Sequence, residues 1–411
     1  MRYKGTDKDI REIGNELDVE TILEGSVQKE KDNIRINVKL NRAQDGLNLW
    51  AESYDRKVES IFAIQDEISK AVVTALRIEL VAGQEYMLVK RYTQDPDAYN
   101  LYLEGRLNWN KRTDDGLKKS IELFQTAIAK DPNFALAYVG IADAYLLLAR
   151  IDILAPRVAY PKAKEAVEKA LEVDSALAEG YAALAFIKYN YDWDWMGAEM
   201  DFNWAIGLNP NYATAYQYYG ILLGSLGRFE EALAKLEKAT ELDPSSVPVR
   251  ASIASLYIHS RQYDLAVKQS REIHKMAPDS HWGPIFLGEA ELQRRSFRKA
   301  IKEFEKGNRL AGPSGLYLPQ IAYAQAAAGN RAEAQRILED LIKRSEKAYI
   351  PAYSLAHILI AMGDKDRAFK YLEKAYEEKS TGMILLKVDP KLDPLRDDPR
   401  FNALLERMNL R

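Results

Sequence analysis

Histidines are the first residues in this sequence that could hold a metal ion. The chain has four of them, His259, His274, His281 and His357, and no cysteine. A zinc site would need three histidines, or two with carboxylates, converging in space, and the lack of cysteine excludes sulfur-ligated zinc, disulfides and thiolate nucleophiles. We interpret the histidines as ordinary groove or surface residues, and we expect neither a metal site nor a cofactor.

Carboxylates and short motifs give no sign of catalysis either. Adjacent pairs such as Glu230-Glu231 and Asp397-Asp398 are typical of solvated helix faces and caps in a chain with 61 acidic residues. The sequence has no G-x-x-x-x-G-K-S/T loop, no G-x-G-x-x-G after a strand and no G-x-S-x-G elbow. The run from Asp192 to Trp195 could form a sugar-binding aromatic cluster, but packing of a turn between two predicted helices explains it better. We predict a protein without enzymatic activity.

An internal period of 34 residues indicates the architecture that positions these side chains. Alanine recurs at this spacing at Ala198, Ala232, Ala266, Ala300, Ala334 and Ala368. A second series, about twelve residues earlier in each period, contains only glycine or alanine: Gly105, Ala142, Ala185, Gly220, Ala254, Gly288, Ala322 and Ala356. Two helices approach closely only where the side chains between them are small, so each pair of positions predicts a helix-turn-helix unit.

Proline ends several of these units. Because proline lacks an N–H group and restricts the residue before it, it stops one helix and allows the next to begin. The prolines concerned are Pro132, Pro210, Pro244 and Pro278. In the unit from Tyr212 to Pro244 the pattern of large and small residues is most complete, at Tyr216, Tyr219, Gly220, Ala232, Leu236 and Ala239. In this pattern and in its period the chain resembles tetratricopeptide repeat (TPR) proteins.

The resemblance implies a mainly α fold, a TPR superhelical solenoid of about eight helix-turn-helix repeats over residues 98–380. The expected units are roughly 98–132, 133–175, 176–210, 211–244, 245–278, 279–312, 313–346 and 347–380. The first two carry inserts near Lys111–Gly116 and Ile151–Tyr160. A capping segment should follow at 381–411, with a short helix from Asn402 to Met408 over the last apolar face, since such arrays need a cap.

TPR geometry also implies a binding groove, because the first helix of each unit lines the inner surface of the superhelix. Its predicted partner contacts are Tyr99, Tyr102, Arg106, Trp109, Phe186, Tyr189, Asn190, Gln217, Ser225, Ser255, His259, Trp282, Glu289, Tyr323, Tyr353 and His357. An aromatic-rich concave wall suits an extended or helical peptide, since aromatic rings bury much area at small entropic cost. The alternative is that several of these side chains only pack between repeats. We expect the hollow side to stay open for a guest polypeptide.

The amino-terminal residues follow a different period. Apolar residues alternate with polar ones at Ile34, Ile36, Val38 and Leu40, which predicts a half-buried strand. Neighbouring strands are expected at Thr21–Gln28 and Leu47–Asp55, with helices near Asp7–Leu17 and Ser60–Leu80. These elements predict a small α/β domain with a three-stranded sheet over residues 1–82, followed by a linker or helix at 83–97.

Three segments of this region are similar to the TolB amino-terminal-like (FlgO-like) domain: Ile22–Val27, Leu49–Arg56 and Ile61–Ile68. That domain precedes TPR arrays in bacterial class III adenylate cyclases and in CadC-like winged-helix regulators. Such proteins carry a further strand and helix before the point that corresponds to Arg2, and an effector domain before those. The resemblance therefore implies an incomplete sheet, whose open edge could pair two copies into a homo-oligomer.

Net charge and hydropathy limit the classes of partner that the sequence favours. The net charge is -3, so no global field favours nucleic acid or an acidic membrane surface. Met1–Lys4 lacks the apolar core of a signal peptide, and no long apolar run predicts membrane insertion, which favours a cytoplasmic location. The sequence predicts a protein–protein interaction scaffold or sensory module that binds a peptide or protein. The alternative is the regulatory region of a nucleotide cyclase or winged-helix transcription regulator whose effector domain lies upstream.

Overall fold

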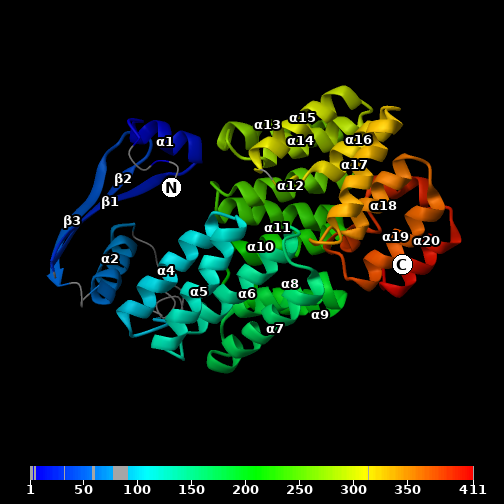
Figure 1. Cartoon of the computed structure of the whole chain (residues 1–411). Coiled ribbons are helices and arrows are strands. Elements are labelled where there is room, and N and C mark those ends of the chain that lie inside the picture. The colour runs from blue at the N-terminus through cyan, green and yellow to red at the C-terminus, as the bar shows by residue number, and fades with distance from the viewer. Residues whose placement is uncertain are drawn as a thin grey trace. The chain divides into compact units, whose positions relative to one another are not determined.

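The computed structural model describes residues 3, 6–31, 33–57, 61–76, 91–312 and 314–410. The chain divides into two compact units, Met1–Asn100 and Leu101–Arg411. Figure 1 shows strands only in the first unit and helices through the whole of the second. Within the described residues, no helix combines the length and the apolar character that crossing a bilayer requires.

The amino-terminal unit is built on a three-stranded antiparallel sheet. Its strands β1 (Thr21–Glu30), β2 (Asn33–Arg42) and β3 (Asn48–Lys57) lie in the order β1-β2-β3. The unit also contains helices α1 (Ile10–Leu17) and α2 (Ile61–Ala75). The predicted strands and the first helix are therefore confirmed, whereas part of the helix expected at Ser60–Leu80 lies outside the described residues.

One face of this sheet carries the apolar side chains that the alternating pattern predicts. Ile34, Val38 and Tyr54 are buried on it against Ile64 of α2. The pairing places Leu23 opposite Leu40 and Val27 opposite Ile36, so both β1 residues share this apolar face. Leu23 is nevertheless 50% exposed and Val27 64% exposed. Helix α2 thus covers the β2–β3 side of the face and leaves the β1 side open.

Eight successive helix pairs follow between residues 96 and 377. Their bounds are α4 (Pro96–Asn110) and α5 (Asp114–Lys130), α6 (Ala135–Arg150) and α7 (Pro156–Val173), α8 (Ala178–Ile187) and α9 (Trp195–Leu208), α10 (Ala213–Ser225) and α11 (Phe229–Leu242), α12 (Val247–His259) and α13 (Tyr263–Met276), α14 (Trp282–Gln293) and α15 (Phe297–Leu310), α16 (Leu318–Ala327) and α17 (Arg331–Arg344), α18 (Ala352–Ala361) and α19 (Lys365–Glu377). A π-helical turn, η2 (Lys188–Asp192), extends α8. The predicted TPR solenoid is confirmed.

Small residues mark the crossings of the paired helices, as the period predicts. The six alanines of the 34-residue series are all fully buried. A Cβ atom added at Gly220 would lie 2.7 Å from Leu236 Cγ, and one at Gly288 would lie 2.7 Å from the Phe304 ring. Helices α5, α9, α11 and α13 each end two residues before one of the predicted prolines. Small residues at two positions per repeat therefore allow the close approach of the paired helices, and a proline follows the end of four of the second helices.

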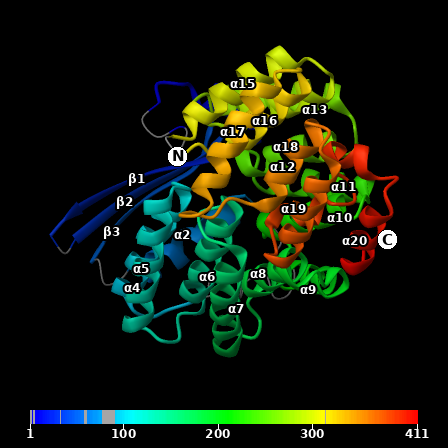
Figure 2. The same cartoon turned by 45° about the vertical axis from the view of Figure 1, so that its right-hand side comes forward.

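The chain ends in three short elements after the last pair. They are η3 (Thr381–Leu385), η4 (Pro390–Leu395) and helix α20 (Pro399–Arg407). Met383, Leu386, Leu392, Leu395 and Leu404 are fully buried, so these elements belong to the core. Figure 2 shows α20 beside α9, far from it in sequence.

Candidate functional site: the inner face of the helical array

The first helices of the pairs form the inner face of the array, and a cavity of about 230 Å³ opens on it between α8, α10, α12 and α14. Most of its wall is apolar, from side chains such as Phe186, Ile221 and Phe286. Residues Thr381–Leu385 of η3 close one side. The polar groups at its wall include Arg150, Asn190, Ser225, Ser252, Ser255, His259 and Thr381. A concave apolar site with a few polar groups is typical of a ligand pocket.

A smaller cavity of about 20 Å³ adjoins the first. Arg150, Phe186 and Trp282 line both cavities. Trp109, Arg112, Asp143 and Tyr218 belong to the wall of the smaller cavity alone. Positive charge is concentrated at this point of the inner face, because two arginines border a space with one carboxylate.

That carboxylate is already paired. Asp143 Oδ2 lies 2.9 Å from Arg106 Nη1, and the Arg106 and Arg112 guanidinium groups lie 4.4 and 4.9 Å from the centroid of the Trp109 ring. Burial lowers the pKa of Arg112, and the neighbouring charges of Arg150 and Arg106 add to the lowering. No carboxylate of the described residues lies within ion-pairing distance of Arg112 or Arg150. The smaller cavity therefore has more positive than negative charge at its wall, because Asp143 is a single carboxylate beside two arginines.

The structure brings many of the predicted groove residues together around these two cavities: Trp109, Phe186, Tyr189, Asn190, Gln217, Ser225, Ser255, His259 and Trp282. Sequence reasoning missed Arg112 and Arg150. Arg112 has a positive φ of 52° in the turn between α4 and α5, and Arg150 is the last residue of α6. Both lie at the predicted inserts, where the regular repeat positions no longer apply. The inserts themselves were the available clue.

Other predicted residues near the start of the array lie elsewhere. Tyr102 packs against Phe124 and Phe134, with ring centroids 5.7 and 5.1 Å away, so it is part of the packing between helices. Arg106 is held by Asp143 beside Trp109. Tyr99 lies near the start of α4, within the amino-terminal unit. Tyr102 therefore fits the alternative that some of the predicted residues only pack between helices.

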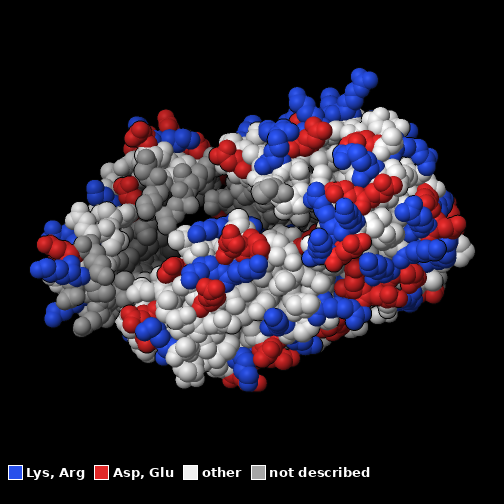
Figure 3. Space-filling view, viewed as in Figure 1, with Lys and Arg blue, Asp and Glu red and all other residues white. Residues whose placement is uncertain are grey.

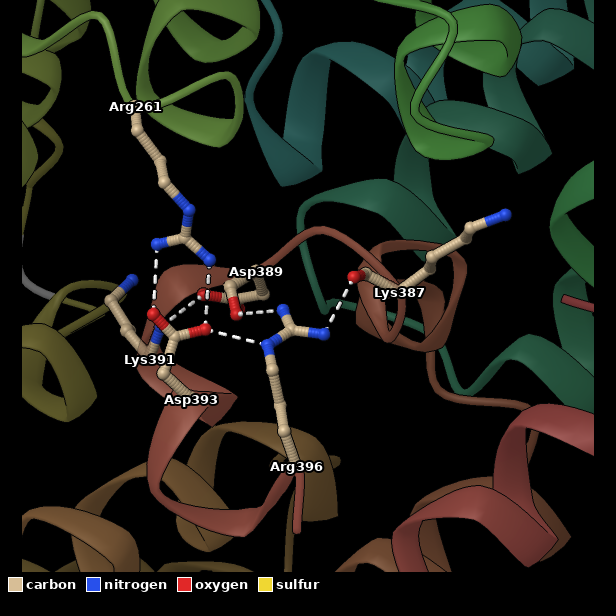
Figure 4. Close-up of polar contacts among 6 residues, drawn as sticks. All are labelled: Arg261, Lys387, Asp389, Lys391, Asp393 and Arg396. Atoms are coloured by element: carbon tan, nitrogen blue, oxygen red, sulfur yellow. Dashed lines mark hydrogen bonds and ion pairs between the residues drawn. The ribbon is translucent and has the colours of Figure 1, made fainter. Parts of the chain in front are cut away.

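The second half of the inner face is filled by the chain itself. We define the C-terminal segment as residues 379–397, which pass along helices α12, α14, α16 and α18 after α19 ends. Figure 4 shows Arg261, in the turn that follows α12, directed at Asp393 of this segment, with two contacts of 2.8 Å. Arg396 in turn donates to Asp393, to the Lys387 carbonyl and to the Asp389 carbonyl. These contacts fix the segment against the array.

Asp389 is the buried centre of this arrangement. Its Oδ2 accepts a hydrogen bond from Tyr353 Oη at 3.1 Å and lies 3.1 Å from His357 Nε2. Its Oδ1 accepts from the Lys391 backbone N–H at 2.9 Å. Burial by itself raises the pKa of this carboxyl, but His357, Lys391 and His259 more than offset that effect and hold its pKa well below the usual range.

Lys391 makes the matching contact on the other side of the segment. Its Nζ lies 2.7 Å from Glu289 Oε2 of α14 and 5.9 Å from the centroid of the Tyr323 ring of α16. Burial by itself lowers the pKa of Lys391, whereas Glu289 and Asp389 raise it above its usual value. Four groove candidates from the later repeats, Glu289, Tyr323, Tyr353 and His357, thus face the C-terminal segment.

The expectation of a hollow that stays open along its whole length was therefore wrong for the later repeats. The physical reason is the set of buried leucines and paired charges in the C-terminal segment, which give it a complementary surface on the inner face. Sequence reasoning assigned this region to capping alone. Within the described residues no cluster of three or more His, Cys, Asp or Glu could hold a metal ion.

Comparison with known proteins agrees with this architecture. Two models of the tetratricopeptide repeat match the chain, at residues 213–246 and 352–381. The chain contains tetratricopeptide repeats. The first match covers α10 and α11, whose crossing at Gly220 is described above, and the second covers α18 and α19.

Curated relatives match part of the chain. It is 33% identical over 191 residues to "Putative adenylate cyclase 3" of Rhizobium meliloti (strain 1021), a match that covers 44% of this chain and 31% of the relative. It is 25% identical over 304 residues to "Transcriptional regulator HilA" of Salmonella typhimurium, covering 73% of this TPR chain and 54% of the relative. The chain thus spans about a third to a half of the length of these relatives.

Solved structures share the fold at low sequence identity. The human IFIT1 dimer with m7Gppp-AAAA is 14% identical with a TM-score of 0.50, and the match covers 76% of each chain. Yeast Tom70 is 19% identical with a TM-score of 0.47, over 84% of this chain and 77% of Tom70. At 14% identity the likeness to IFIT1 shows the fold alone.

Proposed function

We propose that this chain is a non-enzymatic scaffold or regulatory module that binds a protein or peptide partner on the inner face of its earlier TPR repeats. The observation that carries the proposal is the open part of that face between α6 and α14. Half-buried aromatic and cationic side chains line the two cavities there, namely Tyr218, Trp282, Phe286, Arg112 and Arg150. TPR proteins in general are scaffolds without enzymatic activity, which supports the first part of the proposal. The later repeats are excluded from it, because the C-terminal segment occupies them.

The distribution of charge on the surface favours partner binding in a groove over binding through a large charged patch. Figure 3 shows basic and acidic side chains intermixed on the face in view, without a large patch of one sign. Together with the net charge of -3, this distribution favours a protein partner over nucleic acid. The same proposal places the module in the cytoplasm.

A second proposal, which the names of the relatives favour, is that the chain is the regulatory region of a larger protein. The adenylate cyclase and HilA relatives both extend well beyond the matched region. In this reading residues 1–82 form a partial TolB amino-terminal-like domain, 83–97 a linker, 98–380 the TPR array and 381–411 the cap of a regulatory region. The coding sequence upstream of Met1 tests it, because a cyclase or winged-helix domain encoded in frame is the expected finding.

A position-specific cross-link tests the groove. We would replace Tyr218, at the wall of the smaller cavity, with benzoylphenylalanine and irradiate the native cell extract. Met200, 67% exposed on α9 away from the cavities, is the matched control position. A defined protein adduct from position 218, absent from position 200 and competed by excess unmodified chain, is the expected result. Equal adducts at both positions, or none at 218, would overturn the proposal.

A further inference from the structure

The two cavities on the inner face together have the chemistry of a site for a small organic anion. The larger is mostly apolar, and at about 230 Å³ it lies below the roughly 300–1,000 Å³ of pockets for drug-sized ligands. It has room for one compact apolar group, such as a phenyl ring with a short alkyl chain. The charged side chain at its wall is Arg150.

Arg150 also borders the smaller cavity, together with Arg112. The guanidinium group of arginine is planar and offers paired donors that match a carboxylate. Because one arginine borders both spaces, the apolar group and the anion must be only a few bonds apart in the same ligand. A carboxylate attached to a compact apolar group meets this requirement.

Charge compensation gives a second, independent reason. Asp143 is paired with Arg106 at 2.9 Å and its charge also acts on Arg112, but among the described residues no ion pair joins Arg112 or Arg150 to a carboxylate. Burial, followed by the charge of Arg112, also lowers the pKa of nearby His281 to about 4. Both arginines are half-buried, and positive charge that is partly removed from water is costly unless an anion accompanies it.

We propose that Arg150 and Arg112 bind the carboxylate of a small apolar acid whose hydrocarbon part fills the cavity lined by Phe186, Ile221 and Phe286. Such a ligand would lie between the third to sixth helix pairs and the C-terminal segment, at the boundary between the open and the filled parts of the inner face. The site goes beyond the proposed partner groove, since it takes a free ligand. The apolar C-terminal residue of a peptide offers the same chemistry from another source.

Titration calorimetry of the full chain with 4-phenylbutyrate tests the site, with 4-phenylbutanamide as the uncharged probe. We expect saturable binding of the acid and binding of the amide weaker by roughly tenfold or more, the loss typical of a hydrogen bond to a charged group. Arg150→Gln should weaken binding of the acid by a similar factor. Arg336→Gln, on the exposed face of α17, should leave it unchanged.

A cavity-filling variant keeps the test independent of the arginines. Ser255→Leu places a larger side chain at the cavity wall and should abolish binding while circular dichroism stays that of the wild type. A tetrapeptide ending in phenylalanine, with a free or an amidated carboxyl end, distinguishes the two sources. Tighter binding of the free-ended peptide than of phenylbutyrate would assign the site to a chain terminus and overturn the small-acid proposal. Failure of phenylbutyrate to saturate, or equal binding by Arg150→Gln, would overturn it as well, whereas the cross-link at position 218 would be unaffected.

Discussion

The indole Nε1 of Trp195 donates a 2.7 Å hydrogen bond to the backbone carbonyl of Met408, 213 residues further along the chain. Trp195 opens α9 in the third helix pair, and Met408 directly follows α20. Close by, the ring of Trp193 lies 4.8 Å from that of Tyr376, and Lys379 Nζ lies 3.6 Å from the Trp193 centroid. The third pair is thus joined to the end of the array, which closes the superhelix on itself.

Trp195→Phe should loosen this junction. The phenyl ring keeps most of the packing but leaves the Met408 carbonyl without its buried donor, which costs about 1 to 3 kcal/mol. Urea unfolding followed by circular dichroism measures the loss, and hydrogen exchange should increase in residues 399–410. Trp204→Phe is the matched control, because Trp204 lies on the same helix and is 62% exposed. A loss no greater than that of the control would contradict the structural role of the bond.

Asp389→Asn should strongly destabilise the later repeats. Asparagine preserves the shape of the side chain but removes the charge that faces His357 and Lys391 in the buried arrangement. Removal of one partner from a buried ion pair typically costs about 3 to 5 kcal/mol, and we expect a loss near the lower end of that range. Urea unfolding at pH 7 measures it. Asp397→Asn, at an exposed position in the same region, should leave stability nearly unchanged.

The difference in stability between the wild type and Asp389→Asn should depend on pH in a direction that the pKa of Asp389 fixes. The folded-state pKa of Asp389 is lowered below the unfolded value of about 3.9. Its contribution to stability is therefore fully present above that pH and is lost as the pH falls towards the folded-state pKa. The difference in unfolding free energy between wild type and Asp389→Asn should shrink between pH 5 and pH 2. A difference that stays constant over this range would contradict the lowered pKa.

Asp152→Asn should have the opposite effect. Burial, and then the charge of Glu378, raises the pKa of Asp152 to about 8. The folded state thus prefers the protonated form, so stability is present below the unfolded pKa of about 3.9 and is lost as the pH rises to about 8. Asparagine tolerates the positive φ of 58° at this position. We expect a gain of about 1 to 3 kcal/mol at pH 9 and little change at pH 4, measured by thermal unfolding.

The control for this variant is Asp279→Asn, at an exposed position between α13 and α14. It should alter stability equally at both pH values. If Asp152→Asn behaved in the same way, the carboxyl of Asp152 would be fully ionised at neutral pH in the folded protein.

Local physics explains which parts of this fold the sequence could predict. Gly105 and Ala232 fall at helix crossings because steric limits there act within one repeat, over about a dozen residues of sequence. The alternation from Ile34 to Leu40 predicts the sheet for the same local reason. The contact between Trp195 and Met408, 213 residues apart, depends instead on how far the intervening helix pairs rotate about the superhelix, and no local pattern encodes that rotation.

The residues of the candidate site also differ in whether a local sequence pattern could predict them. Phe186 and Trp282 could be predicted because they occupy regular inner positions of their repeats. Arg112 and Arg150 could not, since each lies at the edge of an insert where the repeat spacing fails. Tyr353 lies on α18, the first helix of its pair, and its neighbour there is Asp389 of the same chain.

Leu23 and Val27 offer a test of self-association through the sheet. Both are exposed on the apolar face of β1, which is an edge strand among the described residues. We predict concentration-dependent association of the wild type in sedimentation velocity, because such an edge can pair with another copy. The double variant Leu23→Lys and Val27→Lys should stay monomeric. Leu265→Lys, at an exposed position on α13, should associate like the wild type, and a wild type that is monomeric throughout would end this prediction.

Alanine substitutions at two glycines in neighbouring helices should distinguish a helix-crossing position from an ordinary helix position. A Cβ atom at Gly220 would lie 2.7 Å from Leu236 Cγ and 3.0 Å from the Ala232 carbonyl oxygen, so Gly220→Ala forces α10 and α11 apart. Overpacking of this kind costs about 1 to 3 kcal/mol. A Cβ atom at Gly207 would meet nothing within 4 Å, and alanine there should stabilise α9 by about 0.5 to 1 kcal/mol. Urea unfolding of the two variants should therefore give shifts of opposite sign, and shifts of the same sign would show that small residues at the crossings are not required for close packing of the pair.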